Sequence, residues 1–218
     1  MKRCCSNVRT ITIGDEEYPR QLAGLCLPPQ VLVTRGPRIP TTRRLLTITG
    51  SRSPSFLARQ AAYDLAAASA RAGTHLVVSC NIGVDRHALY GAWEGRRETL
   101  VLFDTPLPRY GWQIPSAILI TPFIDDVLDV HSRRASCAAL CGSLGEATLV
   151  IEAATSSSSI ATACAALDEG KEVFVHTVGL AAERERGGSR LLAEMGAPLV
   201  SSYEELAFHL GWDGPPVV

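Results

Sequence analysis

The chain has 218 residues, of which 46% are hydrophobic and 20% charged, proportions that indicate one globular domain and exclude a disordered chain. Its formal net charge is −1, so any binding of nucleic acid would have to rest on a local basic patch. No apolar run approaches the ~18–20 residues that span a membrane, and the basic N-terminus lacks the apolar stretch of a signal peptide, so we expect a cytoplasmic protein.

The predicted elements change in kind near residue 40. Before it, prolines interrupt the chain around one short strand at 30–36, which we interpret as part of an N-terminal extension, 1–40. After it, apolar strands are predicted at 45–50, 75–80, 99–103, 117–121, 147–153, 172–178 and 197–200. Helices are predicted at 54–73, 84–95, after 153, at 188–195 and at 202–210.

This alternation of strands and helices predicts an α/β fold of the Rossmann-like, doubly wound kind, with a mainly parallel sheet and helices on both faces. We place this domain at 41–212 and a short tail at 213–218.

The seven cysteines are odd in number and their spacing forms no disulfide framework, which suits a reducing compartment. Cys137 and Cys141 lie four residues apart on a predicted helix, with His131 nearby. They could begin a zinc site, but no fourth ligand is evident, so core packing is the favoured interpretation.

The candidate site lies where strands end, because ligands of doubly wound folds bind outside the carboxyl ends of the strands. A glycine, hydroxyl groups and an arginine follow the first strand, and a carboxylate with four serines follows the strand at 147–153. The glycines, hydroxyls, arginine and acids in these positions favour a phosphate or nucleotide pocket: Gly50, Ser51, Arg52, Ser53, Ser79, Gly83, Asp85, Glu152, Ser157 and Ser159.

Each of these residues also has a plain structural interpretation. Serines and aspartates before helices are ordinary N-caps, and a glycine after a strand is often only a turn. The chain contains neither GxGxxG nor GxxxxGK[ST], which argues against a dinucleotide site and a P-loop. Glu152 and Asp85 could form a pair of acids, but no catalytic constellation stands out, and we assign no catalytic residue.

Five segments in register resemble the DNA-processing protein A (DprA/Smf) family. They run in order from about residue 18 to 200: YPRQLAGLCLPPQVLVTRG, ITGSRSPS, VVSCNIGVDRHAL, ATLVIEAATSSSSIATACAALDEGKEVFV and GGSRLLAEMGAPLV.

The resemblance implies single-stranded DNA binding and delivery of that DNA to a RecA-type recombinase in natural transformation, with no metal or cofactor. It also implies a homodimer. Carried over by position, it adds Thr162 and Lys171 to the phosphate-binding residues, with Lys171 at the rim beside Arg133 and Arg134.

Several positions depart from the family pattern. The family's Arg-Asn-Arg motif before the strand at 147–153 aligns with Cys137-Ala138-Ala139, which removes phosphate-binding charge. The family's Ser-Gly-Ser becomes Ser157-Ser158-Ser159, and we expect no winged-helix domain of the kind that many members carry. Few aromatic residues are available for stacking bases, with Phe56, Tyr90 and Tyr110 as the candidates.

Two other functions remain open. The same pocket could bind a mononucleotide, as in the nucleotide-sensing domains of the wider superfamily or its nucleoside-monophosphate phosphoribohydrolases, although the Pro-Gly-Gly-x-Gly-Thr motif of the hydrolases is absent. The chain could also be a scaffold with a decayed site that acts through protein contacts.

Overall fold

The structure is a computed structural model, and it describes residues 8–41, 44–107, 116–125, 128–181 and 187–212. The predicted tail at 213–218 therefore lies outside the described residues, as does Tyr110.

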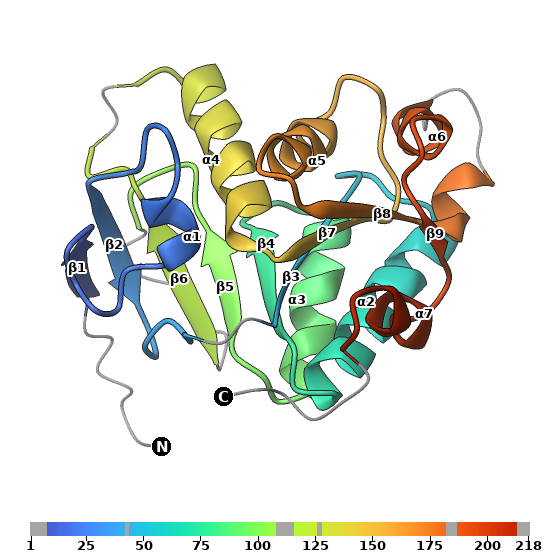
Figure 1. Ribbon diagram of the computed structural model, residues 1–218, viewed down its shortest axis with the longest axis horizontal. Coiled ribbons are helices and arrows are strands. Elements are labelled where there is room, and N and C mark those ends of the chain that lie inside the picture. Colours follow the sequence, from blue (N-terminus) through green and yellow to red (C-terminus); the bar gives the residue numbers. More distant parts are fainter. Residues whose placement is uncertain (1–7, 42–43, 108–115, 126–127, 182–186, 213–218) are drawn as a thin grey trace.

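The described residues form one nine-stranded sheet in the order β1-β2-β6-β5-β4-β3-β7-β8-β9 (Figure 1). In chain order the strands are β1 (Val8–Thr12), β2 (Val31–Arg35), β3 (Leu45–Thr49), β4 (His75–Ser79), β5 (Thr99–Leu102), β6 (Ala117–Thr121), β7 (Ala147–Val150), β8 (Glu172–His176) and β9 (Leu199–Val200). Every neighbouring pair from β6 to β9 in this order is parallel, whereas β1 and β2 add antiparallel strands at one side. The predicted mainly parallel sheet is confirmed.

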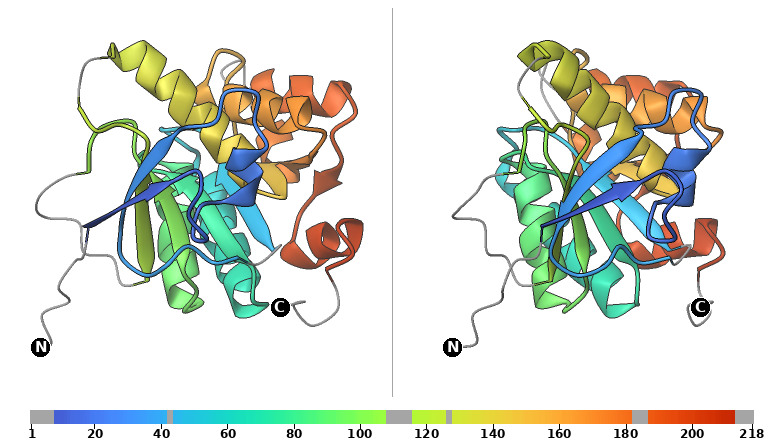
Figure 2. Two further views of the ribbon diagram at one scale, coloured as in Figure 1. Left: turned by 60° about the vertical axis from the view of Figure 1, so that its left-hand side comes forward. Right: turned by 90° about the vertical axis from the view of Figure 1, so that its left-hand side faces the viewer.

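Helices cover both faces of the sheet (Figures 1 and 2). One face packs against α2 (Phe56–Arg71), α3 (Val84–Glu94) and α7 (Tyr203–His209), and the other against α1 (Arg20–Ala23), α4 (Val130–Leu144), α5 (Ser158–Asp168) and α6 (Gly187–Glu194). Alternation along β3 divides its side chains between the two cores, because successive side chains of a strand point to opposite faces. Leu46 and Ile48 join the α2–α3 core, while Leu45 joins the α4 core.

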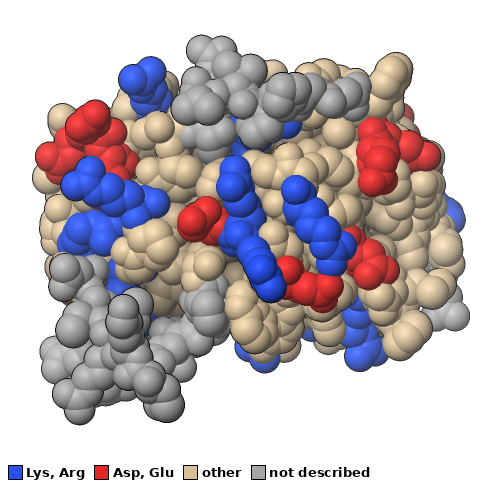
Figure 3. All heavy atoms as spheres, turned by 90° about the horizontal axis from the view of Figure 1, so that it is seen from below, with Lys and Arg blue, Asp and Glu red and all other residues tan. Residues whose placement is uncertain are grey.

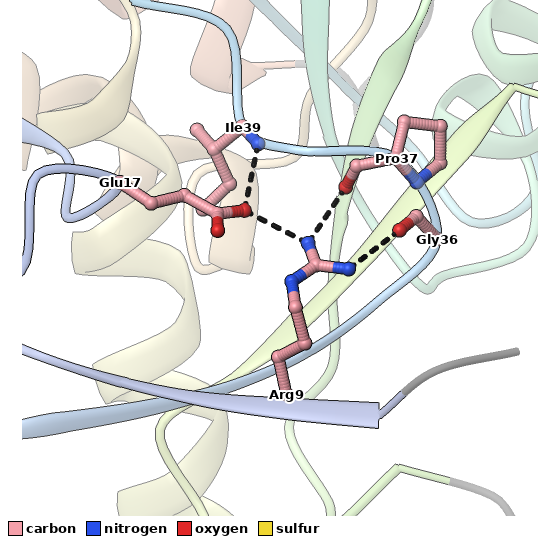
Figure 4. A network of polar contacts seen from close by, with 5 residues as sticks. All are labelled: Arg9, Glu17, Gly36, Pro37 and Ile39. Carbon is pink, nitrogen blue, oxygen red and sulfur yellow. Dashed lines mark hydrogen bonds and ion pairs between the residues drawn. The ribbon is translucent and has the colours of Figure 1, made fainter.

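The segment before residue 40 supplies β1 and β2, so two strands of the sheet come from the region expected to be an extension. Arg9 on β1 anchors it, as Figure 4 shows. The Arg9 guanidinium donates to the carbonyls of Gly36 and Pro37 at 2.8 and 2.9 Å, and pairs with Glu17 at 2.8 Å. Glu17 in turn accepts from the Ile39 N–H at 3.1 Å. These contacts fasten the first strand to the turn that leads into β3.

Two of the differences from the prediction have a local physical reason. β1 was not predicted, because its sequence VRTIT contains only two apolar residues, and this edge strand buries only Ile11 fully. The strand predicted at 172–178 ends at His176, where a 3-10 turn (η1, Thr177–Leu180) begins. The His176 ring accepts from the Val178 N–H at 3.1 Å and ends the strand there.

The chain order of the parallel strands reverses between β3 and β7. From β3 the chain moves outward through β4, β5 and β6, and from β7 it moves outward the other way through β8 and β9. The connections therefore diverge at the carboxyl ends of β3 and β7, which is where doubly wound folds leave a crevice.

Candidate functional site

A cavity of about 570 Å³ opens at this crevice. It is lined by the segments after β3, β4, β5 and β7 and by α4 and α5. Its lining residues are Thr49, Gly50, Ser51, Arg52, Ser53, Ser79, Cys80, Asn81, Leu102, Asp104, His131, Arg134, Cys137, Ala138, Ala154, Ser156, Ser157, Ser158, Ser159 and Thr162.

The segment after β3 brings a glycine and a cation to the cavity. A Cβ on Gly50 would come within 2.6 Å of the Val84 side chain and 3.0 Å of the Glu152 carbonyl oxygen, so only glycine fits this close approach of loop, strand and helix. The Ser51 N–H donates to the same Glu152 carbonyl at 2.5 Å. Arg52 and Ser53 follow as exposed side chains on the cavity wall. Among the described residues, Arg52 forms no ion pair.

Asp85 holds the loops together beneath the cavity. It is 1% exposed and does not line the cavity, although Ser79 does. Its carboxylate accepts from the Ser79 hydroxyl at 2.6 Å and from the Ser79 N–H at 3.1 Å. Burial raises the pKa of Asp85 to about 6, against these hydrogen bonds, which lower it. This residue therefore ties the end of β4 to the start of α3.

Gly83 packs the same loop against the one after β3. Its φ of +84° lies in a region that favours glycine, and a Cβ there would come within 2.2 Å of the Ser51 carbonyl oxygen. Gly83 is likewise not among the lining residues, so it shapes the site from behind.

Glu152 turns away from the cavity toward α2. Its carboxylate accepts from the Ser55 hydroxyl at 2.8 Å and from the Ser55 N–H at 3.2 and 3.3 Å. Ser55 is the N-cap of α2, and its oxygen accepts from the Ala58 N–H at 3.1 Å. The structure thus places the two predicted acids, Asp85 and Glu152, in separate structural contacts and brings neither to the cavity wall.

The hydroxyl cluster after β7 does reach the cavity. Ser157 is the N-cap of α5, and its Oγ is buried without a hydrogen-bond partner among the described residues. Ser159 donates to the Gly50 carbonyl at 2.9 Å, and Thr162 donates to the Ser158 carbonyl at 3.1 Å. The last two fasten α5 to β3 and to its own first turn, whereas the buried Ser157 hydroxyl keeps unused bonding capacity.

Lys171 is at the opposite edge of the sheet, and its expected place at the rim of the phosphate site is wrong. It directly precedes β8, which runs parallel to β7, so it lies at the amino ends of the strands. Its ammonium group donates to the Ser143 carbonyl, and burial lowers the pKa of Lys171. The family motif gives the position of Lys171 along the chain, but it does not show at which end of β8 the residue lies.

Arg133 and Arg134, the two arginines of α4, lie in different environments. Arg134 lines the cavity and forms an ion pair with Asp104 at 3.4 Å. Arg133 is 8% exposed, donates to the Leu128 carbonyl at 3.0 Å and does not line the cavity. Adjacent helical residues point about 100° apart, and here Arg134 faces the cavity while Arg133 is directed to the Leu128 carbonyl.

Sequence reasoning missed Asn81 and Asp104 as cavity residues. Both follow strands by two residues, and that position was itself a usable signal. The Asn81 amide donates to the Ser79 hydroxyl at 2.6 Å.

The cysteines that the structure describes do not assemble a metal centre. Among the described residues, no group of three or more His, Cys, Asp and Glu side chains is placed to hold a metal ion. Cys137 and Cys141 are buried in the core under α4, and burial raises the pKa of Cys80 to about 12, so its thiol is inert near neutral pH.

No helix in the described part of the chain has the length and apolar character to cross a membrane.

The two aromatic candidates among the described residues, Phe56 and Tyr90, lie outside the cavity. Phe56 begins α2 and is 71% exposed, and Tyr90 on α3 is 43% exposed, but neither is among the lining residues.

Comparison with known proteins places this architecture among DNA-processing proteins. A family model described as DNA recombination-mediator protein A matches residues 9–211. The DNA processing protein DprA of Bacillus subtilis (strain 168) is 26% identical over 209 residues, which are 91% of this chain and 70% of that protein.

Two solved structures share the fold. DNA processing protein A from Streptococcus pneumoniae superposes with a TM-score of 0.78 at 18% identity, over 93% of this chain and 74% of that one. DNA processing protein A from Helicobacter pylori, whose structure was described for its mode of single-stranded DNA binding, superposes with a TM-score of 0.79 at 21% identity, over 95% of this chain and 97% of that one.

Proposed function

The chain belongs to the DNA recombination-mediator protein A family, and from that premise we propose that it binds single-stranded DNA at the cavity between β3 and β7. A role in DNA processing and recombination fits the family and its relatives.

The observation that carries the proposal is the pairing of a cation with unused donors at one end of the cavity. Arg52 lines the cavity without an ion pair among the described residues, and the Ser157 hydroxyl is buried without a partner there. Ser157 also begins α5, and the first N–H groups of a helix favour an anion. A backbone phosphate bound there would offer acceptor oxygens to these groups.

The two acids predicted from the sequence are occupied in structural contacts. Asp85 and Glu152 are each 1% exposed and engaged with Ser79 and Ser55, so neither carboxylate is presented to a ligand in the cavity.

The wider role rests on family membership. It comprises delivery of the bound strand to a RecA-type recombinase, assembly as a homodimer and location in the cytoplasm. Pull-down of a recombinase and sedimentation of the purified protein test the first two parts.

DNA binding is tested by fluorescence anisotropy with a labelled oligothymidylate at two salt concentrations. Arg52→Ala should weaken binding about tenfold and flatten the salt dependence, since each lost phosphate contact removes about 0.7 from the slope of log affinity against log salt. The matched control is Arg71→Ala, which removes an arginine at the other edge of the sheet. Equal losses in the two variants, or none in Arg52→Ala, would contradict the assignment.

A mononucleotide is the second candidate ligand. The cavity volume of about 570 Å³ lies in the range of small-molecule sites, about 300–1,000 Å³. Mononucleotide binding with no measurable affinity for the oligonucleotide would favour it.

A further inference from the structure

The outer face of α2 and α3 carries basic and aromatic side chains beside the cavity. The two helices lie side by side (Figure 1), and a Cβ on Gly91 of α3 would come within 2.1 Å of the Tyr63 carbonyl oxygen of α2. Five residues within the first two turns of these helices make up what we call the α2–α3 surface: Phe56, Arg59, Arg86, His87 and Tyr90.

Both aromatic rings of the α2–α3 surface are exposed to solvent. Phe56 is 71% exposed and Tyr90 is 43% exposed. Arg59 follows Phe56 by three residues, and Tyr90 follows Arg86 by four, spacings that place side chains next to one another on a helix. Each helix therefore presents one arginine beside one aromatic ring.

The two arginines of this surface lie near the same histidine, one on each helix. Burial lowers the pKa of His87, and the nearby guanidinium groups of Arg59 and Arg86 lower it further. Neither arginine forms an ion pair with any residue that the structure describes. Their positive charges are therefore available to an anion.

The acids of the two helices are directed elsewhere. Asp85 is buried, and Glu94 pairs with Arg71 at 2.6 Å at the far end of the helices. Asp64 accepts from its own helix neighbour Gln60 at 2.8 and 2.9 Å. It follows Arg59 by five residues, which places it about 140° around α2 from that arginine. The α2–α3 surface is therefore positive, and it favours an anionic partner.

The α2–α3 surface begins where the cavity ends, at Arg52. Gly83 directly precedes α3, and a Cβ there would come within 2.7 Å of the Arg52 Cα, so the start of α3 packs against the loop that carries this arginine. The same loop leads into α2, which begins at Phe56. A strand with a phosphate at Arg52 therefore has both helix starts beside it as it leaves the cavity.

We propose that a single strand of DNA held at the cavity continues over the α2–α3 surface, with phosphates at Arg59 and Arg86 and bases stacked on Phe56 and Tyr90. The inference rests on the proposed function. Arginines beside exposed aromatic rings suit a single strand, because each of its nucleotides carries both a phosphate and a flat base. An acidic protein segment would pair with the arginines, but its carboxylates have no flat base to stack on the rings.

The test compares labelled oligothymidylates of about 5 and about 20 nucleotides by fluorescence anisotropy at two salt concentrations. Arg86→Ala should weaken binding of the long oligonucleotide about fivefold and lower the slope of log affinity against log salt by about 0.7. Its affinity for the short oligonucleotide, which the cavity can hold alone, should stay within about twofold of wild type.

A second pair of variants tests stacking. Tyr90→Ala should weaken the long oligonucleotide about fivefold without changing the salt slope, because it removes a ring and no charge. Tyr90→Phe keeps the ring and should restore wild-type affinity. The same loss in Tyr90→Phe as in Tyr90→Ala would overturn the assignment of Tyr90 to stacking.

The matched control is Arg20→Ala, which removes an exposed arginine from α1 on the opposite face of the sheet. It should keep the affinity for both lengths within about twofold of wild type. Unchanged thermal unfolding of all variants shows that the fold is intact.

The remaining outcomes separate this inference from the proposed function. Wild-type affinity of Arg86→Ala and Tyr90→Ala for the long oligonucleotide, or equal losses for both lengths, overturns the α2–α3 surface and leaves DNA binding at the cavity standing. Failure of the wild-type protein to bind either length overturns both proposals. Polyglutamate binding that Arg86→Ala abolishes, with affinity for the long oligonucleotide unchanged, assigns the surface to an acidic protein and overturns the path of the strand.

Discussion

The two edges of the parallel sheet are made from the same strand–helix units, yet they differ in chemistry. At the amino edge, where α2 and α3 end, basic and acidic side chains lie beside one another (Figure 3). Arg71 pairs with Glu94 at 2.6 Å, and Arg97 donates to the Gly73 carbonyl at 3.0 Å. The Arg71–Glu94 pair is exposed to solvent, where ion pairs contribute little to stability.

At the carboxyl edge, polar groups are instead drawn into the protein. Ser79 with Asp85, and Ser55 with Glu152, join loops to helix starts below the cavity, and Arg52 and Ser157 keep bonding capacity for a ligand. The helices begin at this edge, so their free N–H groups demand acceptors there. The difference teaches that the direction of the helices, more than the composition of the loops, decides which edge becomes a site.

The largest expected effect comes from a matched pair of glycines, one at each edge. Gly83→Ala forces a Cβ into the Ser51 carbonyl and strains a φ of +84°, so we expect a loss of about 3–5 kcal/mol in the free energy of unfolding. Gly170→Ala at the amino edge strains a φ of +69° but meets nothing within 4 Å, and should cost about 1 kcal/mol. Urea denaturation measures both, and equal losses would remove the contrast between the edges.

The raised pKa of the buried Asp85 carboxyl group predicts how the free energy of unfolding depends on pH. Its folded pKa of about 6 lies above its ordinary 3.8, so folding favours the protonated form. The stabilisation is therefore complete below pH 3.8 and is lost as the pH rises through about 6, a change of about 3 kcal/mol. Relative to Asp85→Asn, the wild-type free energy of unfolding should fall by that amount over this range. A constant difference between the two proteins would contradict the raised pKa.

Removing a helix N-cap that also binds a buried carboxylate should destabilise the protein more than removing an N-cap without such a partner. Ser55→Ala removes the α2 cap and a donor to Glu152, so we expect a loss of about 2 kcal/mol. Ser202→Ala removes only the cap of α7, where the serine accepts from the Glu205 N–H at 3.3 Å, and should cost about 1 kcal/mol. Thermal unfolding compares the two, and the idea fails if the Ser202 variant is the less stable.

The smallest expected effect comes from a substitution at the amino edge of the sheet. Glu94→Gln breaks an exposed ion pair with Arg71, so the free energy of unfolding should change by less than about 1 kcal/mol. Oligonucleotide affinity should stay the same within about twofold, because the charge lies at the other edge from the cavity. A larger fall in DNA affinity would show that this face also contacts the strand.

The fold was largely predictable, because apolar runs alternating with amphipathic segments carry their own signal. The edge strand β1 escaped detection because a half-exposed strand of Val, Arg and Thr shows too few apolar residues to stand out. The location of the cavity was predictable, since strand ends in a doubly wound fold converge at one edge. The roles of individual residues there were less predictable.

The sequence by itself determined the alternation of elements, the family resemblance and the segments that meet at the cavity. Only the tertiary structure decided that Glu152 supports α2, that Lys171 lies at the far edge and that Asp104 shares the cavity with Arg52. The physical reason is that a pattern along the chain records which residue follows a strand. The direction of its side chain and the partner that it meets depend on elements distant in sequence.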